Sequence, residues 1–407
     1  MSWVKKKLCE VCTIRPPKSE AKNTLLSNEL VSFIGMEHLG INQKFTVPSV
    51  EKPLVDVLGG YTYFAENDVL LAKITPCFEN GKLGIAKNLT NRVGFGSSEF
   101  IVFRANEELS NEWLYYFLSR HQFLQEGANN MSGAVGHKRV NKEFIENYEI
   151  PLPMLPIQQK MVAKLDAIFA EIGKAMAAAE ANIKNAEALF QSYLTEVFEK
   201  IKRESSSVKF GELANFRNGI NFRTSSSGIP VKIFGVRNFK NHFSAPLNDL
   251  DEINLDKNLP KDDLIQSGDI LFVRSNGNSE LIGRCVLFKN VKEEITFSGF
   301  TIRSRLTTNR IFPEFIMYFL KSEKVRKKMI DGGNGANIKS LNQTTLNSLD
   351  IPIPDSLDLQ KKIIDNFDLL EIEKFKLIES YKLKVKNLSD YKNSILQQTF
   401  SGELVKE

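Results

Sequence analysis

Basic and amide side chains gather at two corresponding places in the two halves of the chain. In the first half they follow an apolar run at 69–74, and in the second half they follow a similar run at 270–273. Such side chains bridge base edges and phosphate oxygens of nucleic acids through fork-like sets of hydrogen bonds. The candidates for base or phosphate contact in these loops are Lys73, Thr75, Asn80 and Lys82, and then Arg274, Asn276, Asn278 and Arg284.

A second pair of polar, glycine-rich loops, at 132–139 and 333–339, precedes the last predicted strand of each half. Glycines let backbone amides approach a phosphate closely, while basic and amide side chains reach outward. A solvated turn is the plain alternative for either loop alone, but the paired occurrence favours contact with nucleic acid. The candidates are His137, Lys138 and Arg139, then Asn334, Asn337 and Lys339, with Arg237 and Asn238 added from the turn after a further strand.

These loops belong to an internal repeat with a period of about 200 residues, the strongest signal in the sequence. An apolar segment suited to a helix packed on a sheet recurs, and an Ile-Pro-x-Pro sequence follows it in both halves. This Ile-Pro-x-Pro sequence marks the end of each domain and is called its proline exit. A glutamine comes shortly after each proline exit. The matching pairs are 31–35 with 231–235, 66–70 with 267–271, 113–119 with 315–321, 150–153 with 351–354, and Gln158 with Gln360.

Two long helical segments follow the exits. Residues 157–204 and 357–400 place apolar residues at alternating steps of about three and four, which is typical of a coiled-coil seam. Each helix alone would expose this stripe to water, so the two are expected to pair, and short connections make the pair antiparallel. The expected interface residues are Leu165, Ile168, Ile172, Ile183, Phe367, Leu370, Leu377 and Leu388, with Lys374 interrupting the seam.

The predicted fold class is therefore α+β (mixed α/β), with two globular domains separated by two long antiparallel helices and an approximate internal two-fold repeat. The predicted domains are 1–156 and 205–356, and the predicted helices are 157–204 and, with the tail, 357–407. A coiled coil that joins two copies of the chain is the alternative use of the helices.

The sequence motifs of common catalytic and cofactor sites are absent. Residues 332–337 are glycine-rich, but Lys339 is misplaced for a nucleotide-phosphate loop, and 94–96 is not completed into a dinucleotide fingerprint. Glu20-Ala21-Lys22 imitates the end of a nuclease metal motif without the preceding aspartate. We therefore expect no catalytic residue, no metal ligand and no bound cofactor in this chain.

Composition agrees with a globular protein and adds little about a partner. The chain is 42% hydrophobic and 25% charged, and its 407 residues suffice for two or three domains. The net charge of +5 falls entirely within 205–356, which is too small an excess to identify nucleic acid. We see no apolar run of membrane-spanning length or signal-peptide type, and four cysteines fit a reducing compartment, so a cytoplasmic location is expected.

The order of these features resembles the specificity subunit of type I restriction-modification systems. The resemblance rests on the duplicated domain, the Ile-Pro-x-Pro exit, the glutamine, the long helix, and the ending Gln-Gln-Thr-Phe-Ser-Gly-Glu-Leu at 397–404. It covers nearly the whole chain. Its short motifs become specific through their order and their duplication.

This resemblance implies a DNA-recognition subunit without catalytic activity, whose two target-recognition domains each read one half of a split double-stranded site. It also implies two modification subunits that bind S-adenosylmethionine and methylate adenine, and motor-nuclease subunits that use ATP and magnesium. The first half's tail at 193–200 lacks the Ser-Gly-Glu-Leu of the second, so identical partner contacts at the two tails are not expected.

Two hypotheses from other classes remain open in the sequence. One is a stand-alone duplicated DNA-binding regulator that dimerises through its helices. The other is an enzyme with an unrecognised site, such as a minimal nuclease that depends on Glu20.

Overall fold

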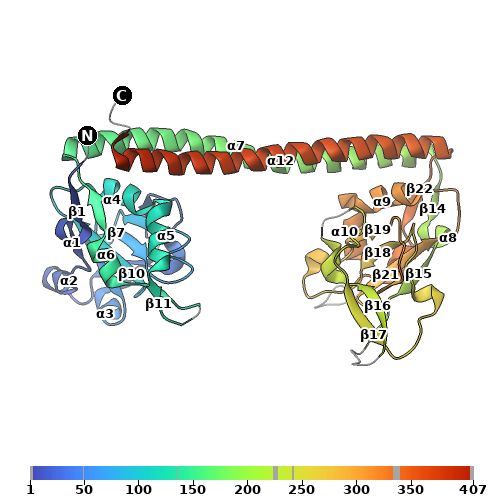
Figure 1. Cartoon of the computed structure of the whole chain (residues 1–407), viewed down its shortest axis with the longest axis horizontal. Coiled ribbons are helices and arrows are strands. Elements are labelled where there is room, and N and C mark those ends of the chain that lie inside the picture. Colours follow the sequence, from blue (N-terminus) through green and yellow to red (C-terminus); the bar gives the residue numbers. More distant parts are fainter. Residues whose placement is uncertain are drawn as a thin grey trace. The chain divides into compact units, whose positions relative to one another are not determined.

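The computed structural model describes residues 3–48, 50–134, 136–222, 228–240, 243–332 and 340–403. The chain divides into two compact units: unit 1 comprises Met1–Ala179 with Leu383–Glu407, and unit 2 comprises Glu180–Lys382. Each unit holds one mixed α/β domain and a part of each long helix, α7 (Leu155–Glu204) and α12 (Leu357–Ser401), as Figure 1 labels them.

The domain of unit 1 is built on two sheets. The first has the strand order β2-β10-β7-β8-β4 and the second has the order β5-β3-β9-β6, with β3 and β9 parallel. The strands of these sheets are β2 (Cys12–Ile14), β3 (Leu30–Ile34), β4 (Phe45–Thr46), β5 (Val50–Pro53), β6 (Thr62–Ala65), β7 (Val69–Ala72), β8 (Leu83–Ala86), β9 (Val93–Gly96) and β10 (Phe100–Ala105).

Short helices and two small two-stranded sheets complete this domain. The helices are α1 (Leu8–Val11), α2 (Ser19–Thr24), α3 (Leu54–Val57), α4 (Asn111–Leu118), α5 (His121–Asn129) and α6 (Lys142–Asn147), with 3-10 turns η1 (Met36–His38) and η2 (Thr90–Arg92). The small sheets pair β1 (Lys5–Lys7) with β13 (Glu149–Pro151), and β11 (Met131–Ser132) with β12 (Arg139–Val140). The strand pair β1–β13 thus brings the start of the domain beside its proline exit.

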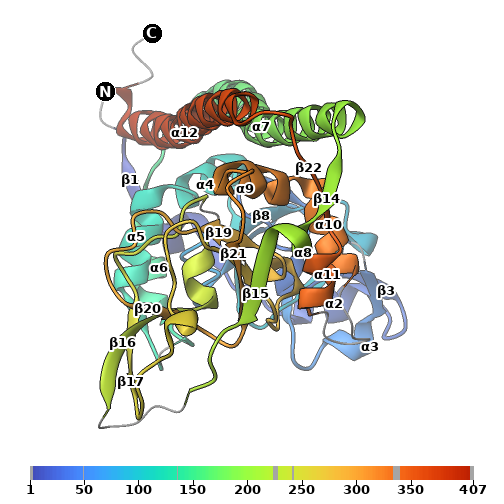
Figure 2. The ribbon, with the colours of Figure 1, turned by 90° about the vertical axis from the view of Figure 1, so that its right-hand side faces the viewer.

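Unit 2 repeats this plan. Its sheets have the orders β15-β21-β18-β19 and β17-β16-β20, with β16 and β20 parallel, and β14 pairs with β22 beneath the end of α7 (Figure 2). The strands are β14 (Ser207–Lys209), β15 (Ala214–Asn218), β16 (Ile229–Phe234), β17 (Asp251–Leu255), β18 (Ile270–Val273), β19 (Cys285–Leu287), β20 (Ile295–Phe297), β21 (Thr301–Leu306) and β22 (Asp350–Pro352). The helices are α8 (Phe210–Leu213), α9 (Pro313–Lys321), α10 (Glu323–Asp331) and α11 (Gln343–Asn347), with 3-10 turns η3 (Val236–Phe239), η4 (Lys261–Asp263) and η5 (Ser279–Leu281).

Strand β7 shows why the central strands read as continuous apolar runs. Its four residues are all buried, because Val69 and Leu71 pack on the side of α4, whereas Leu70 and Ala72 pack against the second sheet. A strand covered on both faces needs apolar residues at every position. Strand β18 repeats the arrangement in unit 2.

A buried glutamine attaches each long helix to the domain that precedes it. The Gln158 side chain accepts a hydrogen bond from the Ser110 backbone N–H at 2.9 Å and donates to the carbonyls of Glu108 and Pro153 at 2.8 Å. The Gln360 side chain likewise accepts from the Phe312 N–H and donates to the Arg310 carbonyl. The paired glutamines of the sequence are therefore structural anchors, and both are almost fully buried.

The end of each long helix packs on the domain of the other half of the sequence. In unit 1, the ring of Phe400 on α12 lies 4.3 Å from that of Trp113 on α4. In unit 2, Phe198 on α7 contacts Phe315 on α9 with ring centroids 5.3 Å apart, and it also contacts Phe367 on α12. In both units the two helices run antiparallel, since the start of one contacts the end of the other.

The seam of α12 passes through polar positions that the apolar pattern had skipped. Leu370 and Leu377 were expected in the helix pair, but they are 39% and 46% exposed. The seam instead takes positions one residue later, at Glu371 and Ile378. Lys374 lies on the seam as expected, with its ammonium 4.1 Å from the centre of the Phe190 ring. The less exposed positions along α12, spaced three and four apart, are Ile364, Phe367, Glu371, Lys374, Ile378, Tyr381, Val385, Leu388, Lys392, Ile395 and Thr399.

The other predicted seam residues lie on the covered side of their helices. Leu165 and Ile172 are buried, and Phe367 is 1% exposed, whereas Ile168, Ile183 and Leu388 are half-buried. The predicted fold class is confirmed in its parts: a mixed α/β domain occurs twice, and each copy is followed by a long helix.

Candidate nucleic-acid interface

Three chain segments meet at one place in unit 1, where β7 ends. The Lys73 backbone N–H donates to the Glu99 carbonyl at 2.9 Å, and the Val140 N–H donates to the Lys73 carbonyl at 3.0 Å. One step further along, the Thr75 N–H donates to the Lys138 carbonyl at 2.9 Å. The fold therefore brings together the two loops that the sequence nominated separately, and it adds the turn that carries Glu99.

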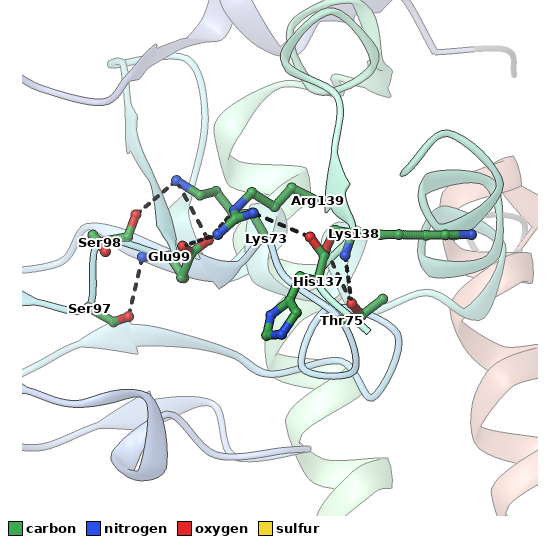
Figure 3. Close-up of polar contacts among 8 residues, drawn as sticks. All are labelled: Lys73, Thr75, Ser97, Ser98, Glu99, His137, Lys138 and Arg139. Carbon is green, nitrogen blue, oxygen red and sulfur yellow. Dashed lines mark hydrogen bonds and ion pairs between the residues drawn. The ribbon is translucent and has the colours of Figure 1, made fainter. Parts of the chain in front are cut away.

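The side chains of these segments form a network that Figure 3 shows. Arg139 donates to both carboxylate oxygens of Glu99, from Nε at 2.9 Å and from Nη2 at 2.8 Å. The Lys73 ammonium donates to the Ser98 carbonyl at 2.8 Å. The Thr75 hydroxyl accepts from the Lys138 N–H, which fixes the backbone at the tip while the Lys138 side chain stays exposed.

Electrostatics favour the charged form of the Glu99–Arg139 pair, whereas burial acts against the charge of Lys73. The hydrogen bonds from Arg139 keep the pKa of Glu99 below its ordinary value, and the nearby Lys73 adds to the effect. Burial lowers the pKa of Lys73, although the Glu99 charge opposes the shift. Arg139 uses three of the five N–H donors of its guanidinium, on Glu99 and on the His137 carbonyl, so it retains two for another acceptor.

The same scaffold recurs in unit 2 at the end of β18. The Arg274 N–H donates to the Phe300 carbonyl at 2.8 Å, and the Leu341 N–H donates to the Arg274 carbonyl at 2.9 Å. These two bonds match those at Lys73 in unit 1. The frame is therefore shared, and the side chains on it differ between the two units.

The other residues predicted in the loops after β7 and β18 do not gather at one place. Asn80 is exposed, whereas the Lys82 ammonium donates to the Met36 carbonyl at 2.7 Å. In unit 2, Asn276 and Asn278 accept hydrogen bonds from backbone N–H groups two residues ahead, which shapes their own loop. The Arg284 Nε donates to the Glu280 carbonyl at 3.3 Å.

The predictions at the turn after β16 and in the second loop of unit 2 have different outcomes. Asn238 is buried, and it bonds the backbone at Gly235 and Asp249, so its side chain is committed to the fold. Arg237 is exposed and pairs with Asp251 at 2.5 Å. Asn334, Asn337 and Lys339 lie outside the described residues, whereas His137 of unit 1 is exposed.

Glu99 and Phe300 are the residues that sequence reasoning missed. Each follows a short turn, Ser97-Ser98 or Ser298-Gly299, and directly precedes a central strand. The prediction from the sequence rested on basic and amide side chains, so it left out a carboxylate and a phenylalanine. The internal repeat was the signal that could have identified them, because Glu99 and Phe300 occupy the same place in it and a serine lies two residues before each.

Glu20, which resembled the end of a nuclease metal motif, takes part in an ion-pair network of the fold. Arg104 donates to both carboxylate oxygens of the buried Asp68, at 2.9 and 2.8 Å, and it also pairs with Glu20. Arg305 and Asp269 repeat the first of these pairs in unit 2. Within the described part of the chain, no group of three or more histidine, cysteine or acidic residues is placed to hold a metal ion.

No helix among the described residues combines the length and the apolar character that crossing a membrane requires.

Comparison with known proteins places these features in one context. The family model described as the type I restriction modification DNA specificity domain matches residues 1–185 and 244–387. The chain is 36% identical over 156 residues to the specificity subunit of the type I restriction enzyme EcoEI of Escherichia coli, across 38% of this chain and 26% of that subunit. It is 24% identical over 335 residues to the EcoKI specificity subunit of E. coli K12, across 74% of this chain and 68% of that subunit.

A solved structure has the same fold along its whole length. It is a chain from a study of complex assembly and conformational transition of the type I R-M system, with a TM-score of 0.80 at 18% identity. The match covers 99% of this chain and 98% of that chain, and at this identity it speaks for the fold. The EcoEI alignment spans only about a quarter of that relative.

Proposed function

This chain belongs to the type I restriction modification DNA specificity family, and on that basis we propose that it selects the DNA site of a type I restriction-modification complex. The site is a split, asymmetric double-stranded sequence, and each unit reads one half of it. The chain directs the adenine methylation or the cleavage that its partner subunits carry out.

The observation that carries this proposal is one scaffold that occurs twice with different side chains. In both units, the residue that follows the central strand, Lys73 or Arg274, is hydrogen-bonded at two places. Its N–H donates to the carbonyl just before the neighbouring strand, and its carbonyl accepts from the segment that follows the second loop. The first copy presents Lys138, Arg139 and Glu99, whereas the second presents Arg274 and Phe300. A duplicated frame with different contact residues is what the reading of two unlike half-sites requires.

The contact chemistry follows from the exposed groups. Arginine donors suit a guanine edge or a phosphate, and lysine at a loop tip suits a phosphate, so Lys138 positions the domain while Arg139 contacts a base or the backbone. We expect the loops of each domain to enter a major groove, which offers a distinct donor and acceptor pattern for every base pair. Specificity is then the product of two short contact sets.

The partners in this proposal are two modification subunits and motor-nuclease subunits. The modification subunits would bind S-adenosylmethionine, and the motor-nuclease subunits would use ATP and magnesium, while this chain acts without catalysis in the cytoplasm. The absence of nucleotide, methyl-donor and nuclease motifs from the sequence supports this division of labour.

The test is co-expression with a modification subunit from the same genome, followed by co-purification and methyl transfer to genomic DNA. Methylated adenines within a split motif, absent when the modification subunit is used alone, are the expected result. A chain that binds one DNA site at nanomolar concentration alone, with no complex and no methylation, would instead be a stand-alone regulator.

A further inference from the structure

One position of the repeated scaffold carries opposite chemistry in the two units. Glu99 directly precedes β10, and Phe300 directly precedes β21. Their carbonyls accept the equivalent hydrogen bonds, from Lys73 in unit 1 and from Arg274 in unit 2. The two residues are therefore structural counterparts with unlike side chains.

The turn that presents these residues is the same in both units. The Glu99 N–H donates to the Ser97 hydroxyl at 3.2 Å, as the Phe300 N–H does to the Ser298 hydroxyl at 3.3 Å. In each turn, the backbone N–H of the residue after Glu99 or Phe300 donates to the carbonyl of that serine. The neighbouring cation also contacts the turn in both copies, at the Ser98 carbonyl in unit 1 and at the Gly299 carbonyl in unit 2.

The side chain of Phe300 has no evident role within the fold. Glu99 is accounted for by its pair with Arg139, but Phe300 is 62% exposed, and the structure records no ring contact for it within the described residues. An exposed phenylalanine forgoes the hydrophobic stabilisation that burial would provide. Its exposure therefore points to a partner outside the chain.

The turn also holds Phe300 in a fixed place. The Gly299 N–H donates to the Ile220 carbonyl at 2.8 Å. A methyl group at Gly219 would lie 2.2 Å from the Ser298 carbonyl oxygen, so the backbones of the two segments are in close contact. The aromatic ring is thus carried on a rigid turn beside Arg274, which lowers the entropy that binding would cost.

We propose that Phe300 is a specificity-determining residue of unit 2, and that its ring contacts the 5-methyl group of a thymine in the second half-site. This inference rests on the proposed function. The thymine methyl is the apolar group that a base pair exposes in the major groove, where arginine and lysine contact guanine and phosphate. Unit 1 places a carboxylate at the equivalent position, so its half-site is read there without such an apolar contact.

The test uses the assembled complex and the split site already mapped by methylation. Duplexes are prepared in which each thymine of the second half-site is replaced, one at a time, by deoxyuridine, which lacks only the methyl group. The wild-type complex should bind one of them about three- to fivefold more weakly, the effect of one buried methyl group. Phe300→Ala should lose at least as much affinity for the natural site and should no longer respond to that replacement.

Two controls make the result specific. Leu357→Ala removes another exposed apolar side chain, 42% exposed at the start of α12, and should leave the deoxyuridine response unchanged. Phe300→Leu keeps an apolar group and should retain part of the response. Phe300→Ala that binds the natural site as the wild type does, or that keeps the same deoxyuridine response, would overturn the assignment. The proposed function would survive that result, because it fails only if no split methylated site exists.

Discussion

Arg139 is paired within its own domain. Its guanidinium is held by both oxygens of Glu99, yet its side chain is still 47% exposed. Such a pair fixes the direction of a flexible side chain and so reduces the entropy lost on binding. In the proposed complex, the carboxylate would also repel phosphates and so disfavour binding in which Arg139 does not find a matching acceptor.

We predict that Arg139→Ala weakens binding of the complex to its site roughly tenfold or more, with the loss confined to the first half-site. Arg139→Lys should not restore binding, because an ammonium cannot replace the bidentate guanidinium. Fluorescence anisotropy with duplexes altered in one half-site at a time measures both effects.

The matched control for Arg139 is Lys142→Ala. Lys142 lies on α6 of the same unit, is 66% exposed at its side chain and pairs with Glu146. Its removal changes the net charge by the same amount but should alter affinity little. If Lys142→Ala weakens binding as much as Arg139→Ala does, the effect is general electrostatics and Arg139 has no special position.

At the scale of elements, the attachment of the helices to their domains depends on two glutamines. Gln158 replaces three hydrogen bonds to water by three bonds to the backbone of the domain. Removing its amide leaves the Ser110 N–H and the carbonyls of Glu108 and Pro153 without this partner in a buried place. Unsatisfied buried groups are more costly than the net gain of the bonds themselves.

Gln158→Ala is therefore predicted to lower the free energy of unfolding by about 2 kcal/mol. Its neighbour Gln159 is exposed, so Gln159→Ala should change stability by less than about 0.5 kcal/mol. Urea unfolding followed by circular dichroism compares the two variants. Equal stability of both would show that the amide network does not hold the helix to the domain.

The outer side of α12 carries apolar residues that no described part of the chain covers. Leu369, Ile372 and Phe375 follow one another at steps of three and are 59%, 53% and 63% exposed. On α7, Ala177 and Ala178 of unit 1 and, separately, Ala181 of unit 2 are also exposed. Exposed apolar surface of this kind is typical of protein interfaces, and in the proposed complex a modification subunit would cover it.

Phe375→Glu, and separately Ala178→Glu, should reduce co-purification of the modification subunit severalfold, because a carboxylate would be buried without a partner. Phe375→Leu is the matched control, since it keeps an apolar side chain at the same place. Assembly that is equally strong with Phe375→Glu and Phe375→Leu would remove α12 from the interface.

At the scale of the whole molecule, α7 begins in unit 1 and ends in unit 2, and α12 returns. We expect the length of the two helices to set the gap between the half-sites. Four extra residues add about 6 Å of helix, which corresponds to roughly two base pairs. The half-sites should not change, because the loops proposed to contact DNA are untouched.

The test inserts four residues after Ala179 in α7 and four in α12 near Lys382, so that the pairing of the helices is kept. Mapping of methylated adenines should then give the same half-sites with a longer spacer. A variant in which four existing residues are replaced by the inserted ones, without a change of length, should retain the original spacer. An unchanged spacer in the lengthened chain would contradict the proposed role of the helices.

Patterns along the chain suffice for much of this architecture. The repeat, the proline exits and the heptad spacing are local, and they predict two mixed domains with two long helices, because periodicity and helix-breaking residues act over a few positions. The same patterns place basic and amide side chains in loops at Lys73 and Arg139. They do not show that these loops meet.

That meeting depends on contacts between distant segments. Lys73, Glu99 and Arg139 come together because β7 and β10 are neighbours in one sheet and the second loop bonds to the end of β7. The seam of α12 also depends on packing: it includes Glu371 and leaves Leu370 39% exposed, although the spacing of apolar residues favours Leu370. Long-range pairing and burial select such positions, and no local pattern of residue types encodes them.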